Sequence, residues 1–164
     1  MISRRLILGV ALTMPAAVAQ TKAKANVDKI PRNVMNALRA RFPNPEIDQW
    51  TREKEGNVVL YDIEFRQGGR KFEADIREDG AFHNWEQAIP AQDLPAAVRN
   101  AVSARYPKAT LKEVMAITAV KDGKDALEGY EIVLATTGKK QVEVTVTPDG
   151  RIVEDSGQPA GPKK

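Results

Sequence analysis

The sequence predicts an α+β fold in which a unit of one helix and four antiparallel strands occurs twice. We expect the two units to join into one long sheet with both helices on one face. Three observations predict this arrangement: a helical segment recurs along the chain, alternating apolar and polar residues follow each copy, and an Asp-Gly turn lies near the end of each half.

The recurring segment covers residues 30–43 and residues 94–107, at a constant displacement (95 − 31 = 64). Chance would give about one identity over such a window, since common residues each make up roughly 5–10% of proteins. The segment therefore marks an internal repeat. The residues that recur are Pro31, Val34, Asn36, Ala37, Ala40, Arg41 and Pro43, matched by Pro95, Val98, Asn100, Ala101, Ala104, Arg105 and Pro107.

Each copy has the apolar spacing of an amphipathic helix, with one stripe expected to face the core. A proline suits the first helical turn, and the second proline of each copy predicts where the helix stops. The two stripes are Ile30, Val34, Ala37, Leu38 and Phe42, and Leu94, Val98, Ala101, Val102 and Tyr106.

Strands are predicted after each helix from the alternation of apolar and polar residues. In the first half they cover residues 46–53, 59–65, 71–77 and 81–87, with a strong hairpin signal at Asp79-Gly80. In the second half they cover residues 111–120, 130–134, 141–147 and 151–154, with residues 121–129 as a longer polar loop. One helix covers one face of its strands, so the opposite face of the sheet is expected to be wide and open to solvent.

The two ends of the chain have the composition of segments outside the fold. Residues 1–19 have a basic start, a short apolar run and an Ala-x-Ala site at Ala17–Ala19, which predicts a signal peptide cleaved near Ala19 and a periplasmic or secreted protein. Residues 20–27 are expected to be flexible and residues 156–164 to be a disordered tail. The repeats then occupy residues 28–92 and 93–155.

Composition excludes several functions. The 164 residues include no cysteine, which excludes disulfides and thiolate chemistry, and no apolar run long enough to span a membrane. Loss of Arg4 and Arg5 with the signal peptide lowers the formal charge from +3 to +1. Charges of both signs are interspersed, which argues against nucleic acid as a partner.

In this order, the repeated motifs resemble those of the PepSY-like family, which is grouped with beta-lactamase-inhibitor-like proteins. The resemblance implies a twice-used unit of one helix and four strands, and a non-catalytic exported protein that binds or inhibits a partner. It does not extend to beta-lactamase inhibition, since no contact residue can be matched. The residues that carry it are Pro31, Val34, Ala37, Phe42, Pro43, Trp50, Tyr61, Ile63, Ala74, Ile76 and Asp79-Gly80, and Pro95, Val98, Ala101, Tyr106, Pro107, Tyr130, Ile132, Val144, Val146 and Asp149-Gly150.

Catalytic and metal-binding chemistry has little support in the sequence. His83 is the only histidine, and zinc sites need several His or Cys ligands. Beyond the expected signal peptide, Ser103 lies on a predicted helix and Ser156 in the tail, away from a triad arrangement with His83. The segment Asp122–Asp125 resembles the start of a calcium loop but lacks the later ligands. We therefore expect no catalytic residue, no metal site and no cofactor.

Binding residues are expected on the sheet face opposite the helices. Trp85 is the ambiguous member: alternation puts it on this face as an interface anchor, whereas a bulge would turn it inward. The expected binding residues are Asp62, Glu64, Lys71, Glu73, Asp75, Arg77, His83 and Trp85.

Three functions remain open from the sequence. The first is an exported, non-catalytic module that binds or inhibits a protein or peptide of the cell envelope through this face. The alternative is an envelope protein that binds a small ligand or a cation through its acidic residues. A hydrolase ranks last, because its paired carboxylates would need a cleft that a flat sheet does not offer. The sequence sets no oligomeric state.

Overall fold

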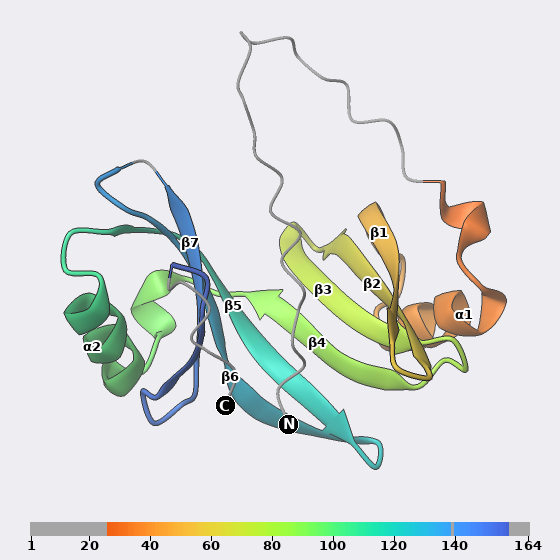
Figure 1. Ribbon diagram of the computed structural model, residues 1–164. Coiled ribbons are helices and arrows are strands. Elements are labelled where there is room, and N and C mark those ends of the chain that lie inside the picture. The colour runs from red at the N-terminus through yellow and green to blue at the C-terminus, as the bar shows by residue number, and fades with distance from the viewer. Residues whose placement is uncertain (1–25, 139, 158–164) are drawn as a thin grey trace, which may run out of the picture.

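The fold is one continuous antiparallel sheet with a helix packed at each end (Figure 1). The computed structural model describes residues 26–138 and 140–157. The expected signal peptide, most of the expected flexible N-terminus and residues 158–164 of the expected tail lie outside the described residues. Among the described residues, no helix is long and apolar enough to cross a membrane.

Four strands follow each helix along the chain. The first part has a short 3-10 helix, Val27–Lys29, then α1 (Arg32–Arg41), β1 (Glu46–Glu55), β2 (Val58–Gln67), β3 (Arg70–Arg77) and β4 (Phe82–Ala88). The second has a 3-10 helix, Ala91–Asp93, then α2 (Ala96–Arg105), β5 (Thr110–Lys121), β6 (Lys124–Ala135), β7 (Gln141–Val146) and β8 (Ile152–Asp155). Each strand pairs with the next along the chain, in the order β1 to β8.

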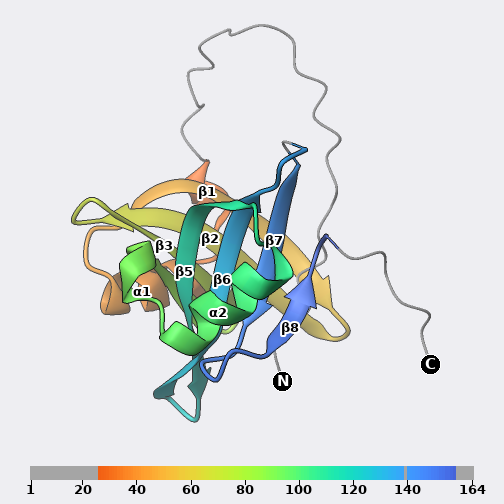
Figure 2. The ribbon, with the colours of Figure 1, turned by 90° about the vertical axis from the view of Figure 1, so that its left-hand side faces the viewer.

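Both helices lie on the same face of this sheet. Val34 and Leu38 of α1 are fully buried in a core with Ile63 and Ile76. Val98 of α2 is fully buried in a second core with strands β5, β6 and β7, over which α2 lies in Figure 2. The strand register connects the two cores, because Trp85 of β4 lies opposite Ala74 of β3 on one side and Thr118 of β5 on the other.

The helices end where the sequence predicts. The N–H of Phe42 donates to the carbonyl of Leu38, and that of Tyr106 donates to Val102, which closes each helix one residue before a proline. Phe42 then enters the first core, where its ring centre lies 5.0 Å from that of Phe65 and 5.7 Å from that of Trp85. Such aromatic pairs add to the apolar burial that stabilises the helix on the sheet.

The β5–β6 hairpin corrects the expected loop at residues 121–129. The structure has a tight turn at Asp122 and Gly123, both with positive φ, and Lys124 already begins β6. Two consecutive positive φ values match the twist of paired strands, which allows the polar residues beyond the turn to continue the ladder. β5 and β6 are consequently the longest strands, and Asp125 comes within reach of Arg41 at the end of α1.

The C-terminal boundary also differs slightly from the expectation. Ser156, which we expected in the disordered tail, donates its N–H to the carbonyl of Glu143, and its hydroxyl oxygen accepts the N–H of Glu143. These bonds extend the pairing of β7 and β8 by one residue.

Candidate functional site: the sheet face opposite the helices

The candidate site is the sheet face opposite the helices, here called the open face. The register assigns its residues, because directly opposed side chains on neighbouring strands point to the same side. Phe72, Ala74 and Ile76 of β3 face the first core, so the residues between them face the other way. On β2, β3 and β4 the open face comprises Leu60, Asp62, Glu64, Arg66, Lys71, Glu73, Asp75, Arg77, Asn84 and Glu86.

Carboxylates on this face form two rows across the strands. In the first row Glu64 of β2 lies opposite Glu73 of β3, which lies opposite Glu86 of β4. In the second row Asp62 lies opposite Asp75, which lies opposite Asn84. Directly opposed side chains are about 5 Å apart at Cβ, and like charges at that distance repel. Acidic side chains are therefore concentrated at the centre of the first half of the sheet.

Burial of these residues corrects the expectation of a solvated face. Glu73 is 7% exposed, Asp75 6% and Glu86 2%. Asp62, Glu64 and Lys71 are half-buried. The sequence pattern cannot show this, because alternation separates the two sides of a strand but does not report how closely neighbouring side chains pack on either side.

Asn84 is a site residue that the sequence did not single out. Its side chain is 8% exposed and faces the open face between Asp75 and Ala119. Its amide oxygen is buried and accepts no hydrogen bond within the described structure. A buried acceptor without a donor is unfavourable by about 1–3 kcal/mol, so such groups often mark the place of a missing partner.

Lys71 lies at one end of the acidic rows, opposite Arg66 of β2. Its ammonium nitrogen lies 3.0 Å from a carboxylate oxygen of Glu73 and 3.0 Å from one of Glu113 on β5. Burial alone would lower the pKa of Lys71, but the negative charge of Glu73 and the hydrogen bonds to both carboxylates raise it above its usual range. Lys71 is therefore charged at neutral pH and bridges β3 and β5.

An apolar strip on β5 continues the open face beyond the acidic rows. Met115 is 1% exposed, Ile117 7% and Ala119 5%, and none of them belongs to either helix-side core. Ile117 lies opposite Glu86, and Ala119 lies opposite Asn84. Val114 and Ala116, the alternate residues, pack in the second core. A strand that is apolar on both sides is the sequence signal for this strip, and the pattern by itself predicts a strand but not a site.

Trp85 is not on the open face, which corrects the expected site. The pairing of β3 and β4 shifts between Asp75 and Ile76, so His83 is the extra residue of a β-bulge. Phe82 and Trp85 consequently both face the helix side, where Trp85 packs against Phe42. Of the two alternatives for Trp85, the structure therefore has the inward-facing one, which a bulge produces.

Above Trp85 lies Arg41, the last residue of α1. The guanidinium carbon is 5.3 Å from the Trp85 ring centre and 5.1 Å from that of Phe82, and its nitrogen pairs with Asp125 of β6. Stacked cations of this kind stabilise aromatic faces modestly. The contact links α1 to the β5–β6 hairpin.

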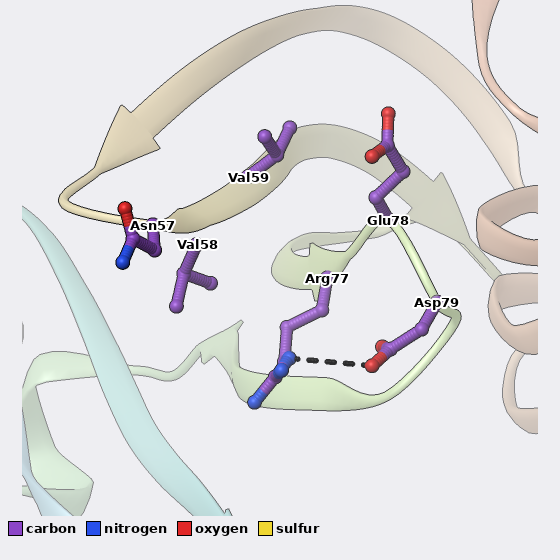
Figure 3. A pocket seen from close by; sticks show the side chains of 6 residues that line it. All are labelled: Asn57, Val58, Val59, Arg77, Glu78 and Asp79. Atoms are coloured by element: carbon purple, nitrogen blue, oxygen red, sulfur yellow. Dashed lines mark ion pairs between the residues drawn. The ribbon is translucent and has the colours of Figure 1, made fainter.

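Arg77, the remaining expected residue, lies at the rim. It is exposed, and its Nε is 3.6 Å from a carboxylate oxygen of Asp79. Figure 3 shows this pair beside a depression between the β1–β2 and β3–β4 turns, lined also by Asn57, Val58, Val59 and Glu78. The depression is separate from the acidic rows. Across the described residues, no three His, Asp or Glu side chains are placed to hold one metal ion.

Comparison with known proteins gives the chain a family match. A family model described as beta-lactamase-inhibitor-like and PepSY-like matches residues 59–154. These residues run from β2 to β8 and include α2. No curated protein matches the chain.

Several solved structures share the fold. A DUF2874 family protein from Bacteroides uniformis is 16% identical, with a TM-score of 0.57 over 76% of this chain and 87% of that one. A protein from Bacteroides eggerthii, described as periplasmic, is 17% identical, with a TM-score of 0.59 over 76% and 86%. A BLIP-like protein from Bacteroides fragilis is 17% identical, with a TM-score of 0.50 over 80% and 91%.

Proposed function

Because this chain belongs to the PepSY-like, beta-lactamase-inhibitor-like family, we propose that it is an exported, non-catalytic module that binds a protein or peptide through its open face. The observation that carries the proposal is the composition of that face. It combines buried carboxylates, a buried amide oxygen without a donor and an apolar strip, while both described helices pack on the other side. Interfaces commonly join an apolar centre to polar groups in this way.

Export is proposed on the sequence and on the fold relatives. Residues 1–19 have the pattern of a signal peptide, and similar folds occur in proteins described as periplasmic. In the proposed mature protein, residues 28–92 and 93–155 are two copies of one unit that share the sheet.

Two equivalent contacts support the proposed repeat. A Cβ on Gly80 would lie 3.0 Å from the carbonyl oxygen of Asn33, and one on Gly150 would lie 2.7 Å from that of Ala97. Both glycines follow an Asp in a turn and have φ near 90°. Each unit therefore places the turn before its fourth strand against the first turn of its own helix.

A face-specific selection tests the binding function. Peptides from a random displayed library are selected on the mature chain and retested on Glu64→Trp, which places a large ring on the open face. Asn36→Trp, on the exposed side of α1, is the matched control. We expect the selected peptides to bind the native chain and the Asn36→Trp variant but not the Glu64→Trp variant. Peptides that bind all three alike would contradict the proposal.

The alternative is a small-ligand or cation site, favoured by the same carboxylates. Thermal unfolding with calcium, magnesium and zinc chlorides tests it, because a ligand that binds only the folded chain raises the melting temperature with its excess over Kd. We expect a flat response. A rise that Glu64→Trp abolishes would favour the alternative.

A further inference from the structure

We propose that the open face takes a cationic segment of its partner: a lysine or arginine side chain seated between the acidic rows, with apolar neighbours on the β5 strip. The inference rests on the proposed binding function and names the chemistry of the partner. It comes from three features of the face, which are the charge of the rows, the amide oxygen of Asn84 and the surroundings of Lys71.

Charge is the first feature. Five carboxylates occupy the two rows on β2, β3 and β4, and the rows are two residues apart along each strand. That spacing is about 7 Å, the same as between alternate side chains of an extended peptide. Electrostatic attraction is stronger at buried groups than in water, so a cation placed here would interact favourably with more than one carboxylate. An anionic partner would be repelled.

Asn84 gives an independent indication of a hydrogen-bond donor. Its oxygen is buried at the end of the second row, beside Asp75, and can only accept. Ammonium and guanidinium groups carry several donors and no acceptor, so one such group could donate to the amide oxygen and to neighbouring carboxylates together. A carboxylate or a carbonyl from the partner would leave this oxygen unsatisfied.

Lys71 shows that the face accommodates an ammonium group. Its nitrogen contacts Glu73 and Glu113 at 3.0 Å each, and those contacts keep it protonated despite partial burial. The segment of the partner would place a second cation on the neighbouring strand β4, toward Glu86 and Asn84. Ile117 and Ala119 lie directly opposite these two residues, so the methylene groups of a long cationic side chain would meet apolar surface.

Three synthetic peptides test the inference. One alternates lysine with valine, and the others carry glutamine or glutamate in place of lysine. Binding to the mature chain is measured by calorimetry in EDTA, which removes divalent cations. We expect the lysine peptide to bind about tenfold more tightly than the glutamine peptide. Its affinity should fall as the salt concentration is raised.

Charge-neutralising variants locate the effect. Glu86→Gln and Asp75→Asn are each expected to weaken the lysine peptide about tenfold and to leave the glutamine peptide unchanged. Asp93→Asn, an exposed carboxylate before α2, is the matched control and should change neither. The inference would be overturned if the affinity for the lysine peptide did not change with salt. It would also be overturned if Asp93→Asn lowered that affinity as much as Glu86→Gln and Asp75→Asn do.

The two proposals fail in different ways. If library selection gives peptides that need the open face but lack lysine and arginine, the cationic inference is wrong and the binding function stands. If no selected or synthetic peptide distinguishes Glu64→Trp from Asn36→Trp, both proposals are wrong.

Discussion

His83 and Trp85 of β4 show how one β-bulge changes the face of the sheet on which the following side chains lie. Alternation from Phe82 would put Trp85 on the open face, but the bulge at His83 returns it to the helix side. The sequence contains no marker for this bulge, because neither residue is a glycine and the hydrophobic pattern of β4 fits both registers. Contact with Phe42, which is distant in sequence, decides between them.

Truncating Trp85 tests this assignment. Trp85→Ala should lower the free energy of unfolding by about 2–4 kcal/mol, because the indole is partly buried against Phe42 and beneath Arg41. His83→Ala should change it by less than about 0.5 kcal/mol, as for a residue outside the packed core. Urea denaturation followed by circular dichroism measures both. A larger loss from His83→Ala than from Trp85→Ala would reverse the assignment of faces.

The turn glycines allow a second test at single residues. Gly80→Ala and Gly150→Ala should each cost about 1–3 kcal/mol, since both need a positive φ and a new methyl group would press on a helix carbonyl. Gly138→Ala is the control, because Gly138 has open space and no positive φ. Thermal unfolding should leave the control within about 0.5 kcal/mol of the native chain. Equal losses at all three positions would show that the close approach to the helices is unimportant.

Among the elements, the sequence predicts both helices and all eight strands, because amphipathic stripes and Asp-Gly turns are local signals. What it misses is non-local. The polar end of the β5–β6 hairpin reads as a loop, although pairing between the two strands is enough to order it. Burial of Glu73, Asp75 and Glu86 depends on packing across three strands, and no local pattern reports it.

The contact between α2 and β8 depends on a titratable side chain, the carboxylate of Asp155. Oδ1 of Asp155 accepts a hydrogen bond from the Tyr106 hydroxyl, and Oδ2 accepts one of 2.9 Å from the Arg105 guanidinium. Burial alone would raise the pKa of Asp155, but these hydrogen bonds and the charge of Arg105 lower it below its ordinary value. The carboxylate therefore binds its proton less readily in the folded chain than in the unfolded one.

This shift predicts how the contribution of Asp155 depends on pH. Because the pKa of Asp155 is lower in the folded chain, its ionised carboxylate stabilises the fold at pH values above its unfolded pKa of about 4. This stabilisation is lost as the pH falls toward the folded pKa. Asp155→Asn should lower the unfolding free energy by about 1–2 kcal/mol at neutral pH. The difference from the native chain should shrink below about pH 4 in urea titrations. A difference unchanged at the lowest pH at which both chains fold would contradict the assigned cause.

At the scale of the whole molecule, one sheet connects two separate cores. β4 pairs with β5 over Asn84–Ala88 and Met115–Ala119, and the β5–β6 hairpin reaches Arg41 of α1. On the helix side of the sheet the two apolar cores are separate clusters, one beneath each helix. Stability of the two halves is therefore expected to be coupled through backbone pairing and through the open face, which crosses the junction from Glu86 to Ile117.

The two tryptophans make this coupling measurable. Trp50 and Trp85 both lie in the first half, on β1 and β4, so their fluorescence reports that half, while circular dichroism reports the whole chain. Val98, fully buried beneath α2, belongs to the other core. Val98→Ala should cost about 2 kcal/mol by loss of apolar contacts and creation of a cavity, and Val98→Asp several kcal/mol by burial of an unpaired carboxylate. The total stability of such a domain is about 5–15 kcal/mol, so the second change should nearly unfold the chain.

If the sheet unfolds as one unit, Val98→Ala should shift the tryptophan transition in urea by as much as the dichroism transition. Val34→Ala, at the matching position beneath α1, is the control that must move both signals, because it lies in the half that contains both tryptophans. Tryptophan fluorescence that keeps its native midpoint in Val98→Ala, while dichroism shows an earlier phase, would mean that the halves unfold independently. Continuous pairing from β4 to β5 favours the single transition, because loss of β5 would expose the β4 edge and the carboxylates beside it.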